Sequence, residues 1–105
     1  MIAYHGTAKP SSTKLEMGTY LTCDKLLAKW YADNSASEFG GCAKLASTKL
    51  TGEGLLLDTD VLEWIGYEEE SLKSYLEQGY SFIHNESFTE IVILATFDCK
   101  MEDQQ

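Results

Sequence analysis

Three residues could do chemistry together although they come from distant parts of the chain. His5 lies in the opening segment YHGT (4–7), Tyr20 lies in GTYLT (18–22), and Glu90 precedes the apolar run IVILATF. An imidazole can donate or accept hydrogen bonds, an aromatic ring can clamp a flat ligand, and a carboxylate can stabilise developing positive charge. Two interpretations stay open: the three are ordinary strand residues, or they meet at one ligand-binding cleft.

The position of Glu90 bears on the choice between these two interpretations. A carboxylate that enters an apolar strand is costly unless it is paired, hydrogen-bonded or at the rim of a cleft. The simpler interpretation is that Glu90 is the solvated first residue of its strand. Residue type alone favours that simpler interpretation, and it favours an ordinary strand role for His5 and Tyr20 as well.

The elements that must position these residues follow from the spacing of apolar residues and turn formers. Strands are predicted over residues 2–5, 18–22, 42–50, 55–58, 80–84 and 88–97. Helices are predicted over residues 23–34, 60–65 and 68–79. The first helix should begin after Thr22 as its N-cap, end at Asn34, and bury Leu26, Leu27, Trp30 and Tyr31. His84 is expected to be solvated, and the polar tail over residues 99–105 is expected to fray.

This order of elements predicts the α+β class, with a mixed or antiparallel sheet and a few short helices. The 105 residues suit one domain spanning residues 1–105. There is no apolar run near eighteen residues and no visible secretory signal, so neither a membrane span nor secretion is expected. Three cysteines without a CxxC pair favour a reducing cytoplasm, and no metal site is predicted.

The charge is strongly negative, at −9, from 17 acidic and 8 basic residues. All the basic residues are lysines, so chemistry that requires an arginine clamp or finger is excluded. The acidic balance also disfavours nucleic acid as a ligand, since phosphate contacts depend on Lys and Arg. A basic protein partner remains compatible with this charge.

Taken in order, the segments YHGT, GTYLTCDKLLAKWYA, LEQGYSFI and FTEIVIL resemble the ADP-ribosyltransferase fold family, and more narrowly its His-Tyr-Glu branch. The resemblance covers roughly residues 2–97. It implies an ADP-ribosyltransferase-like fold with split β-sheets and NAD as the substrate. It also implies that His5, Tyr20 and Glu90 form the catalytic set, and that the NAD-binding residues are His5, Gly6, Thr7, Gly18, Tyr20, Thr22, Ala28 and Tyr31.

The resemblance also assigns roles that the physical chemistry supports. Cleavage of NAD at its glycosidic bond passes through an oxocarbenium-like ribose, which the Glu90 carboxylate would stabilise. His5 would hold a ribose of NAD and Tyr20 would stack on the nicotinamide. Gly6, which lacks a Cβ, would let the backbone approach the ligand and bond the nicotinamide amide.

The absence of arginine discriminates within the superfamily. It excludes the Arg-Ser-Glu branch and disfavours the RNA 2′-phosphotransferases, which rely on arginines. The pyrophosphate would then be held by backbone N–H groups, by the hydroxyls of residues 11–13, or by Lys9 or Lys14. Phe88 stands two residues before Glu90, where arginine-modifying relatives carry Glu or Gln, so an arginine acceptor is not supported.

The resulting hypothesis is an NAD-dependent mono-ADP-ribosyltransferase that modifies a host protein in the host-cell cytoplasm. A minimal effector of this size resembles phage inhibitors of bacterial defence complexes, such as anti-CRISPR transferases. The alternative is a non-enzymatic acidic protein that blocks a basic nucleic-acid-binding partner by charge mimicry. NAD hydrolysis without an acceptor is a third possibility, because the same glutamate would serve it.

Overall fold

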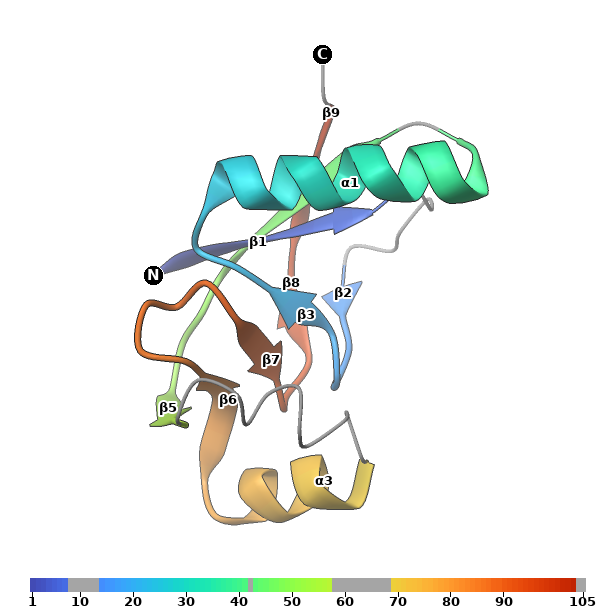
Figure 1. The fold of residues 1–105 in the computed structure, drawn as a ribbon. Helices are drawn as coiled ribbons and strands as arrows, with labels where there is room; N and C mark the ends of the chain where they lie inside the picture. Colours follow the sequence, from blue (N-terminus) through green and yellow to red (C-terminus); the bar gives the residue numbers. More distant parts are fainter. Residues whose placement is uncertain (8–13, 42, 58–68, 104–105) are drawn as a thin grey trace.

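The computed structural model describes residues 1–7, 14–41, 43–57 and 69–103. Over these residues the chain forms two helices and three small sheets, which confirms the predicted α+β class (Figure 1). The Cα radius of gyration is 13.3 Å, close to the value of about 13 Å expected for a compact chain of about 100 residues. The predicted helix over residues 60–65 and the loop residues 8–13 lie outside the described residues.

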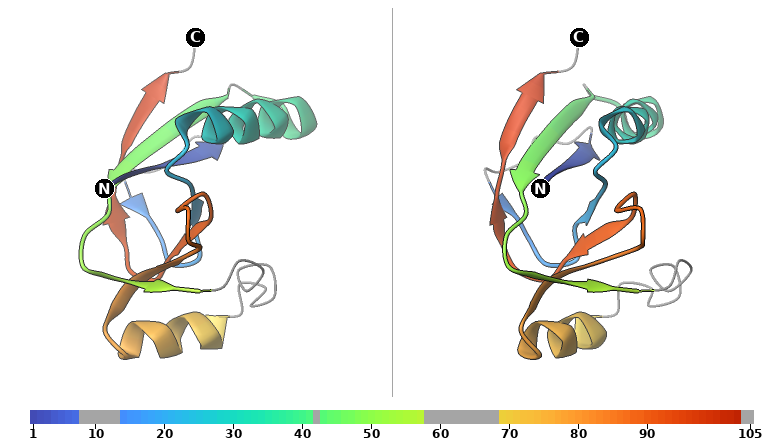
Figure 2. Two further views of the ribbon diagram at one scale, coloured as in Figure 1. Left: turned by 60° about the vertical axis from the view of Figure 1, so that its left-hand side comes forward. Right: turned by 90° about the vertical axis from the view of Figure 1, so that its left-hand side faces the viewer.

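The first sheet carries the N-terminal strand and one of the helices. Strand β1 (Ile2–Thr7) pairs antiparallel with β4 (Lys44–Lys49), which pairs antiparallel with β9 (Lys100–Asp103). Helix α1 (Lys25–Phe39) lies along β1 on one face of this sheet (Figure 2). The helix turns Ala28 and Ala32 toward the sheet, and both are fully buried. Small side chains on this face let the helix and strand backbones come close.

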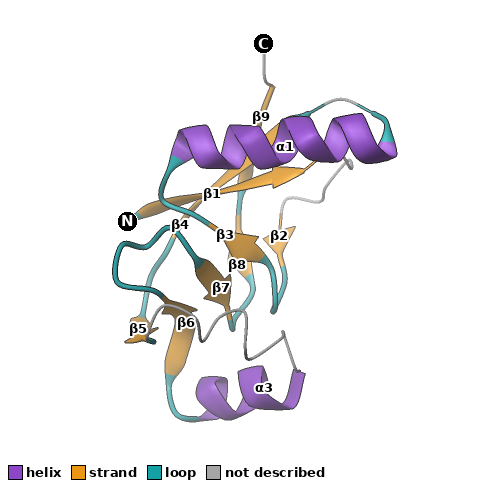
Figure 3. Ribbon diagram, in the orientation of Figure 1, coloured by secondary structure: helices purple, strands orange, loops and turns teal. Residues whose placement is uncertain are grey.

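The other two sheets complete the fold (Figure 3). One is a pair formed by β2 (Lys14–Leu15) and β8 (Phe97–Asp98). The other has the strand order β3 (Tyr20–Leu21), β7 (Ile91–Ile93), β6 (Tyr80–His84) and β5 (Glu53–Leu56). It is mixed, because β5 and β6 run parallel while its other pairs are antiparallel. Helix α3 (Glu69–Glu77) lies at the opposite end of the molecule from α1 (Figure 1).

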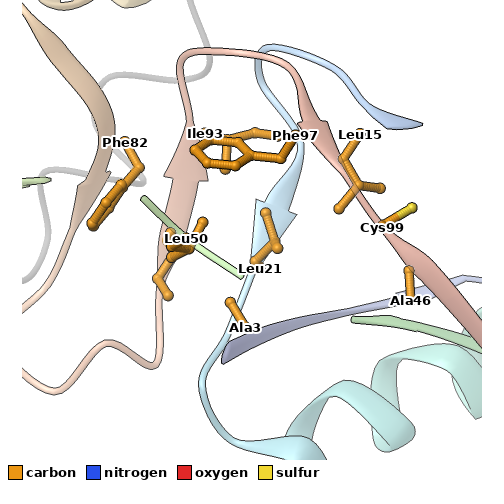
Figure 4. Packing of buried hydrophobic residues seen from close by; sticks show 10 residues of the cluster. Ala3, Leu15, Leu21, Ala46, Leu50, Phe82, Ile93, Phe97 and Cys99 are labelled. Atoms are coloured by element: carbon orange, nitrogen blue, oxygen red, sulfur yellow. The ribbon is translucent and has the colours of Figure 1, made fainter. Parts of the chain in front are cut away.

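Two apolar clusters cover the two faces of the mixed sheet. The larger cluster joins the sheets and includes Leu21, Ile91 and Ile93, with Ala3 and Ala46 from the first sheet (Figure 4). The second cluster brings Ile83 and Val92 against Leu72 of α3. Because strand side chains alternate, Ile91 and Ile93 enter one cluster while Val92 enters the other. The uninterrupted apolar run IVIL therefore reflects a strand that is buried on both faces.

The predicted boundaries and buried face of the first helix are wrong. The N-cap is Asp24, whose carboxylate accepts from the backbone N–H groups of Leu26 and Leu27. Asn34 does not end the helix, which continues to Phe39 and is followed by Gly40. Of the four residues expected to be buried, Leu26 is 75% exposed and Trp30 is 58% exposed, so these two face outward, while Leu27 is half-buried. Two alanines provide the buried face instead.

Three other sequence predictions need correction. The predicted strand over residues 88–97 is divided, because Phe88 has a left-handed φ of 59° and only Ile91–Ile93 form β7. The expected frayed tail instead contributes β9 to the first sheet. His84 is 8% exposed rather than solvated, and its ring stacks on Phe88 at a centroid distance of 3.9 Å.

Among the described residues, no helix has the length and apolar character that a membrane span requires.

Candidate functional site

The edge of β1 meets β3 next to the predicted histidine. Tyr4 and Thr22 exchange two backbone hydrogen bonds, of 2.8 and 2.9 Å. One residue further along β1, the His5 ring nitrogen Nδ1 lies 2.8 Å from the carbonyl oxygen of Tyr20. The YHGT and GTYLT segments are therefore brought together by a bridge between β1 and the residue that follows β3.

The hydrogen bond fixes the tautomer of His5. A carbonyl oxygen only accepts, so Nδ1 carries the proton and donates it to Tyr20. In the neutral ring, Nε2 is then an acceptor. Burial lowers the pKa of His5 below its ordinary value of 6.5, and this effect exceeds the opposing effect of the Tyr20 hydrogen bond. At neutral pH the ring is uncharged and offers Nε2 to a hydroxyl donor.

A cavity of about 230 Å³ lies where β1, β3 and the start of α1 meet. It is lined by Tyr4, His5, Gly6, Tyr20, Thr22, Ala28 and Tyr31. All the residues predicted to bind NAD are in this lining except Thr7 and Gly18. Thr7 lies at the end of β1, and the Gly18 N–H donates to the Ile93 carbonyl oxygen at 2.9 Å, which anchors the entry to β3.

Aromatic rings form one wall of the cavity. The rings of Tyr20 and Tyr31 meet edge to face, with centroids 5.9 Å apart and an interplanar angle of 85°. Trp30 extends the group outward, with its ring centroid 5.2 Å from that of Tyr31. Tyr31 is 37% exposed, so the wall reaches the surface. Such a wall suits a flat ring, and the faces of its aromatic rings also attract a cationic one.

The absence of a side chain at Gly6 has a packing reason, beside the ligand role that the resemblance implies. A Cβ on Gly6 would lie 2.0 Å from the Ala28 carbonyl oxygen and 2.7 Å from the Ala32 nitrogen. The missing side chain is therefore required by the close approach of α1, and not by a ligand on that face. In a strand, the backbone N–H and C=O groups of successive residues point to opposite edges. Those of Gly6 therefore point to the same edge of β1 as those of Tyr4, where they can bond a ligand.

Glu90 does not line this cavity. It lies immediately before β7, and its side chain is half-buried. The register pairs Tyr20 with Val92, so alternation places the Glu90 side chain on the sheet face that carries Tyr20 and Val92. The Tyr20 hydroxyl also makes a long contact of 3.5 Å to the carbonyl oxygen of Thr89. The glutamate is thus adjacent to the tyrosine wall, outside the walls of the cavity itself.

Asn85 holds the loop that presents Glu90, a role the sequence did not reveal. Its backbone N–H donates to the Glu90 carbonyl oxygen at 3.0 Å, and its side-chain oxygen accepts from the Glu90 N–H at 3.1 Å. Its side-chain nitrogen donates to the Thr89 hydroxyl at 3.0 Å. The residue is 7% exposed, so these bonds satisfy a buried amide. The only sequence signal was the turn-forming segment NES.

Replacing Asn85 should therefore loosen the loop. Asn85→Ala should lower the free energy of unfolding by about 2 kcal/mol, because buried partners lose their hydrogen bonds. Asn34→Ala is the matched control: Asn34 is exposed and bonds only a helical carbonyl, so its loss should be within about 0.5 kcal/mol. Urea unfolding measures both, and equal losses would contradict the anchoring role of Asn85.

The shifted pKa of His5 predicts a pH dependence of stability. The unfolded chain takes up a proton near the ordinary pKa of 6.5, while the native ring remains neutral to lower pH. The stability that neutral His5 confers is therefore complete above this pH and falls as the pH drops below it. His5→Asn, which can still donate to Tyr20, should lose less stability between pH 7.5 and pH 5.5 than the original chain. Urea midpoints at the two pH values test this, and identical losses would contradict it.

No family model, curated protein sequence or solved structure matches this chain. Within the described residues, no three His, Cys, Asp or Glu side chains are grouped closely enough to hold a metal ion. The described residues of the site offer a neutral histidine, an aromatic wall, the Gly6 backbone at the edge of β1 and a nearby carboxylate.

Proposed function

We propose that this protein is an NAD-dependent mono-ADP-ribosyltransferase with an ADP-ribosyltransferase-like fold. The observation that carries the proposal is the cavity, which gathers His5, Gly6, Tyr20, Thr22, Ala28 and Tyr31. These residues were chosen from the sequence by resemblance alone, and they come from three separate elements. Their convergence in one cavity is what a common binding function requires.

The proposed mechanism uses each group in a role that its surroundings suit. The nicotinamide ring lies against Tyr20, and the Gly6 backbone at the edge of β1 bonds its amide. The His5 Nε2 atom accepts a hydrogen bond from a ribose hydroxyl, since Nδ1 is occupied by the Tyr20 carbonyl oxygen. The bond between the ribose anomeric carbon and the nicotinamide nitrogen breaks, and the bonding electron pair leaves with nicotinamide. The Glu90 carboxylate stabilises the resulting oxocarbenium-like ribose. A nucleophilic atom of the acceptor then bonds to the anomeric carbon and loses its proton to solvent.

Glu90 reaches the ligand in this mechanism from the loop over Tyr20, at the open side of the cavity. A volume of about 230 Å³ suits the nicotinamide ring and part of its ribose, and leaves the rest of NAD outside. The reacting bond would then lie at the cavity mouth, where an acceptor can approach. We propose a host protein as the acceptor, and inhibition of a bacterial defence complex as the role of a chain this small.

The experiment is to incubate the full chain with NAD and measure released nicotinamide, with and without candidate target proteins. A mass increase of one ADP-ribose on a target supports transfer, and nicotinamide release without a modified target supports hydrolysis. Absence of nicotinamide release under every condition would overturn the proposal.

A second candidate function has one specific observation in its favour. The outer face of α1 exposes Leu26 and Trp30 beside the exposed carboxylates of Asp24 and Asp33. An apolar centre with acidic neighbours suits docking on a basic protein surface, as the charge-mimicry hypothesis requires. A stoichiometric complex that forms equally well without NAD, and without any modification of the partner, would favour this function.

A further inference from the structure

A second cavity lies beside the first and is larger, with a volume of about 620 Å³. It is lined by Ile2, Tyr4, Ser47, Thr48, Lys49, Asp98, Cys99 and Lys100. We refer to it as the lysine groove. Its volume lies within the range of small-molecule sites, which is roughly 300–1,000 Å³. None of its residues except Tyr4 belongs to the cavity around His5.

The register of the first sheet explains how two lysines come to share this groove. Tyr4 pairs with Ser47, and Ser47 pairs with Lys100, which gives one row across three strands. Ile2 pairs with Lys49 in the neighbouring row. Directly paired residues share a face of the sheet, so the two lysines lie on the same face as Tyr4.

That face is the one on which α1 packs. Tyr4 and Gly6 are two residues apart in β1, and the Cβ position of Gly6 points at the Ala28 carbonyl oxygen. The lysine groove thus lies beside the beginning of α1, on the uncovered part of the same face. Lys25, in the first turn of α1, has its ammonium group 5.7 Å from the centre of the Tyr4 ring. A third cation is therefore near the point where the two cavities meet.

The charge in the groove is opposite to that of the whole chain. The chain has a net charge of −9, whereas the described residues that line the groove include two lysines and one carboxylate, Asp98. Concentrating cations in one concave place favours an anionic ligand. Lysine ammonium groups bind phosphate as point charges and do not need the fork of an arginine.

The lysines of the groove offer a way for a chain without arginine to hold a pyrophosphate. Lys14, one of the residues expected for this role, lies on β2 and is not part of either cavity. Lys9 and residues 11–13 lie outside the described residues. Tyr4 lines both cavities, so one ligand can pass from the His5 cavity over Tyr4 to Lys49 and Lys100.

We propose that the lysine groove binds the adenosine diphosphate half of NAD, with Lys49 and Lys100 contacting its phosphates and Tyr4 separating it from the nicotinamide half. This inference rests on the proposed function for the identity of the ligand. It assigns the dinucleotide to two adjacent sites, of which only the smaller contains the reacting bond.

The test uses the two halves of the ligand separately, with binding measured by calorimetry on the full chain. Lys49→Gln/Lys100→Gln should weaken ADP binding at least about tenfold and leave the binding of nicotinamide riboside, which carries no phosphate, unchanged. Asp98→Asn should have the opposite effect and tighten ADP binding, because it removes the negative charge of Asp98 from the groove. The control Lys44→Gln/Lys73→Gln changes the net charge equally at residues outside the groove, and it should leave both affinities within about twofold of the original.

The possible outcomes test the proposal for the lysine groove and the proposed function independently. If ADP does not bind at millimolar concentration, or if the groove and control variants weaken it equally, the assignment of the groove is overturned. If NAD is cleaved and its KM is unchanged in Lys49→Gln/Lys100→Gln, the groove proposal also fails while the function stands. If ADP binding depends on the two lysines but NAD is never cleaved, the function fails while the groove proposal survives as a nucleotide site.

Discussion

Glu90→Gln should reduce the rate of nicotinamide release from NAD by about 10²–10³-fold, because the amide cannot stabilise the developing positive charge on the ribose. The substitution keeps the size of the side chain. The Glu90 backbone makes two hydrogen bonds with Asn85, one to its N–H and one to its side-chain oxygen, and neither involves the changed group. The native fold should therefore persist, with a thermal midpoint close to that of the original chain.

The matched control is Glu86→Gln in the same loop. Glu86 is exposed and does not line the His5 cavity. This variant should keep the original rate of NAD cleavage. Both variants remove one negative charge, so a difference between them reports the position of the carboxylate. Full activity of Glu90→Gln would contradict the assignment of Glu90.

Gly6→Ala should lower the free energy of unfolding by at least about 3 kcal/mol, because the added methyl group would collide with backbone atoms that cannot rotate away. Its Cβ would lie 2.0 Å from the Ala28 carbonyl oxygen. Relief of this overlap requires α1 to move away from β1, which would open the wall that carries Ala28 and Tyr31. We therefore expect loss of NAD binding together with loss of stability.

Gly79→Ala is the comparison for this prediction. Gly79 has a positive φ of 101° and no atom within 4 Å of an added Cβ, so its substitution adds strain without a collision. A loss of about 1–2 kcal/mol is expected there. Urea unfolding measures both variants, and a Gly6→Ala chain that is as stable as Gly79→Ala would contradict the close packing of α1 on β1.

The sequence predicted the local features of this fold well where local rules decide them. The strand at residues 2–5, the strand at Tyr20 and the helix before Gly79 are all present. In each case the apolar spacing and the turn-forming residue are close neighbours in the chain. The residues of the smaller cavity were implied by the resemblance and not by these local rules, and they lie in two short segments and the first turns of one helix.

Features that depend on distant partners could not be predicted in this way. Local pattern could not reveal that α1 buries alanines and exposes Trp30, since that follows from the space left by Gly6 on another element. The tail became a strand only because β4 offered it an edge. The lysine groove depends on the pairing of Ser47 with both Tyr4 and Lys100, so its residues are far apart in the chain.

Glu90 and Asn85 also differ in whether the sequence alone points to their role. The carboxylate at the start of an apolar strand was visible in the sequence. The amide that fixes its backbone was not, because asparagine in a turn has many roles and its bonds to Thr89 and Glu90 appear only in the folded loop.

The most direct test of the central claim, that the His5 cavity binds the nicotinamide half of NAD, is a histidine NMR titration. The chain has only two histidines, so their imidazole signals are readily separated, and Glu90→Gln would prevent turnover during the measurement. We predict that NAD and nicotinamide mononucleotide shift the His5 Nε2 resonance in a saturable manner. The signal of His84, whose ring is stacked on Phe88, should stay within a small fraction of that shift. An unchanged His5 signal at millimolar NAD would contradict the account.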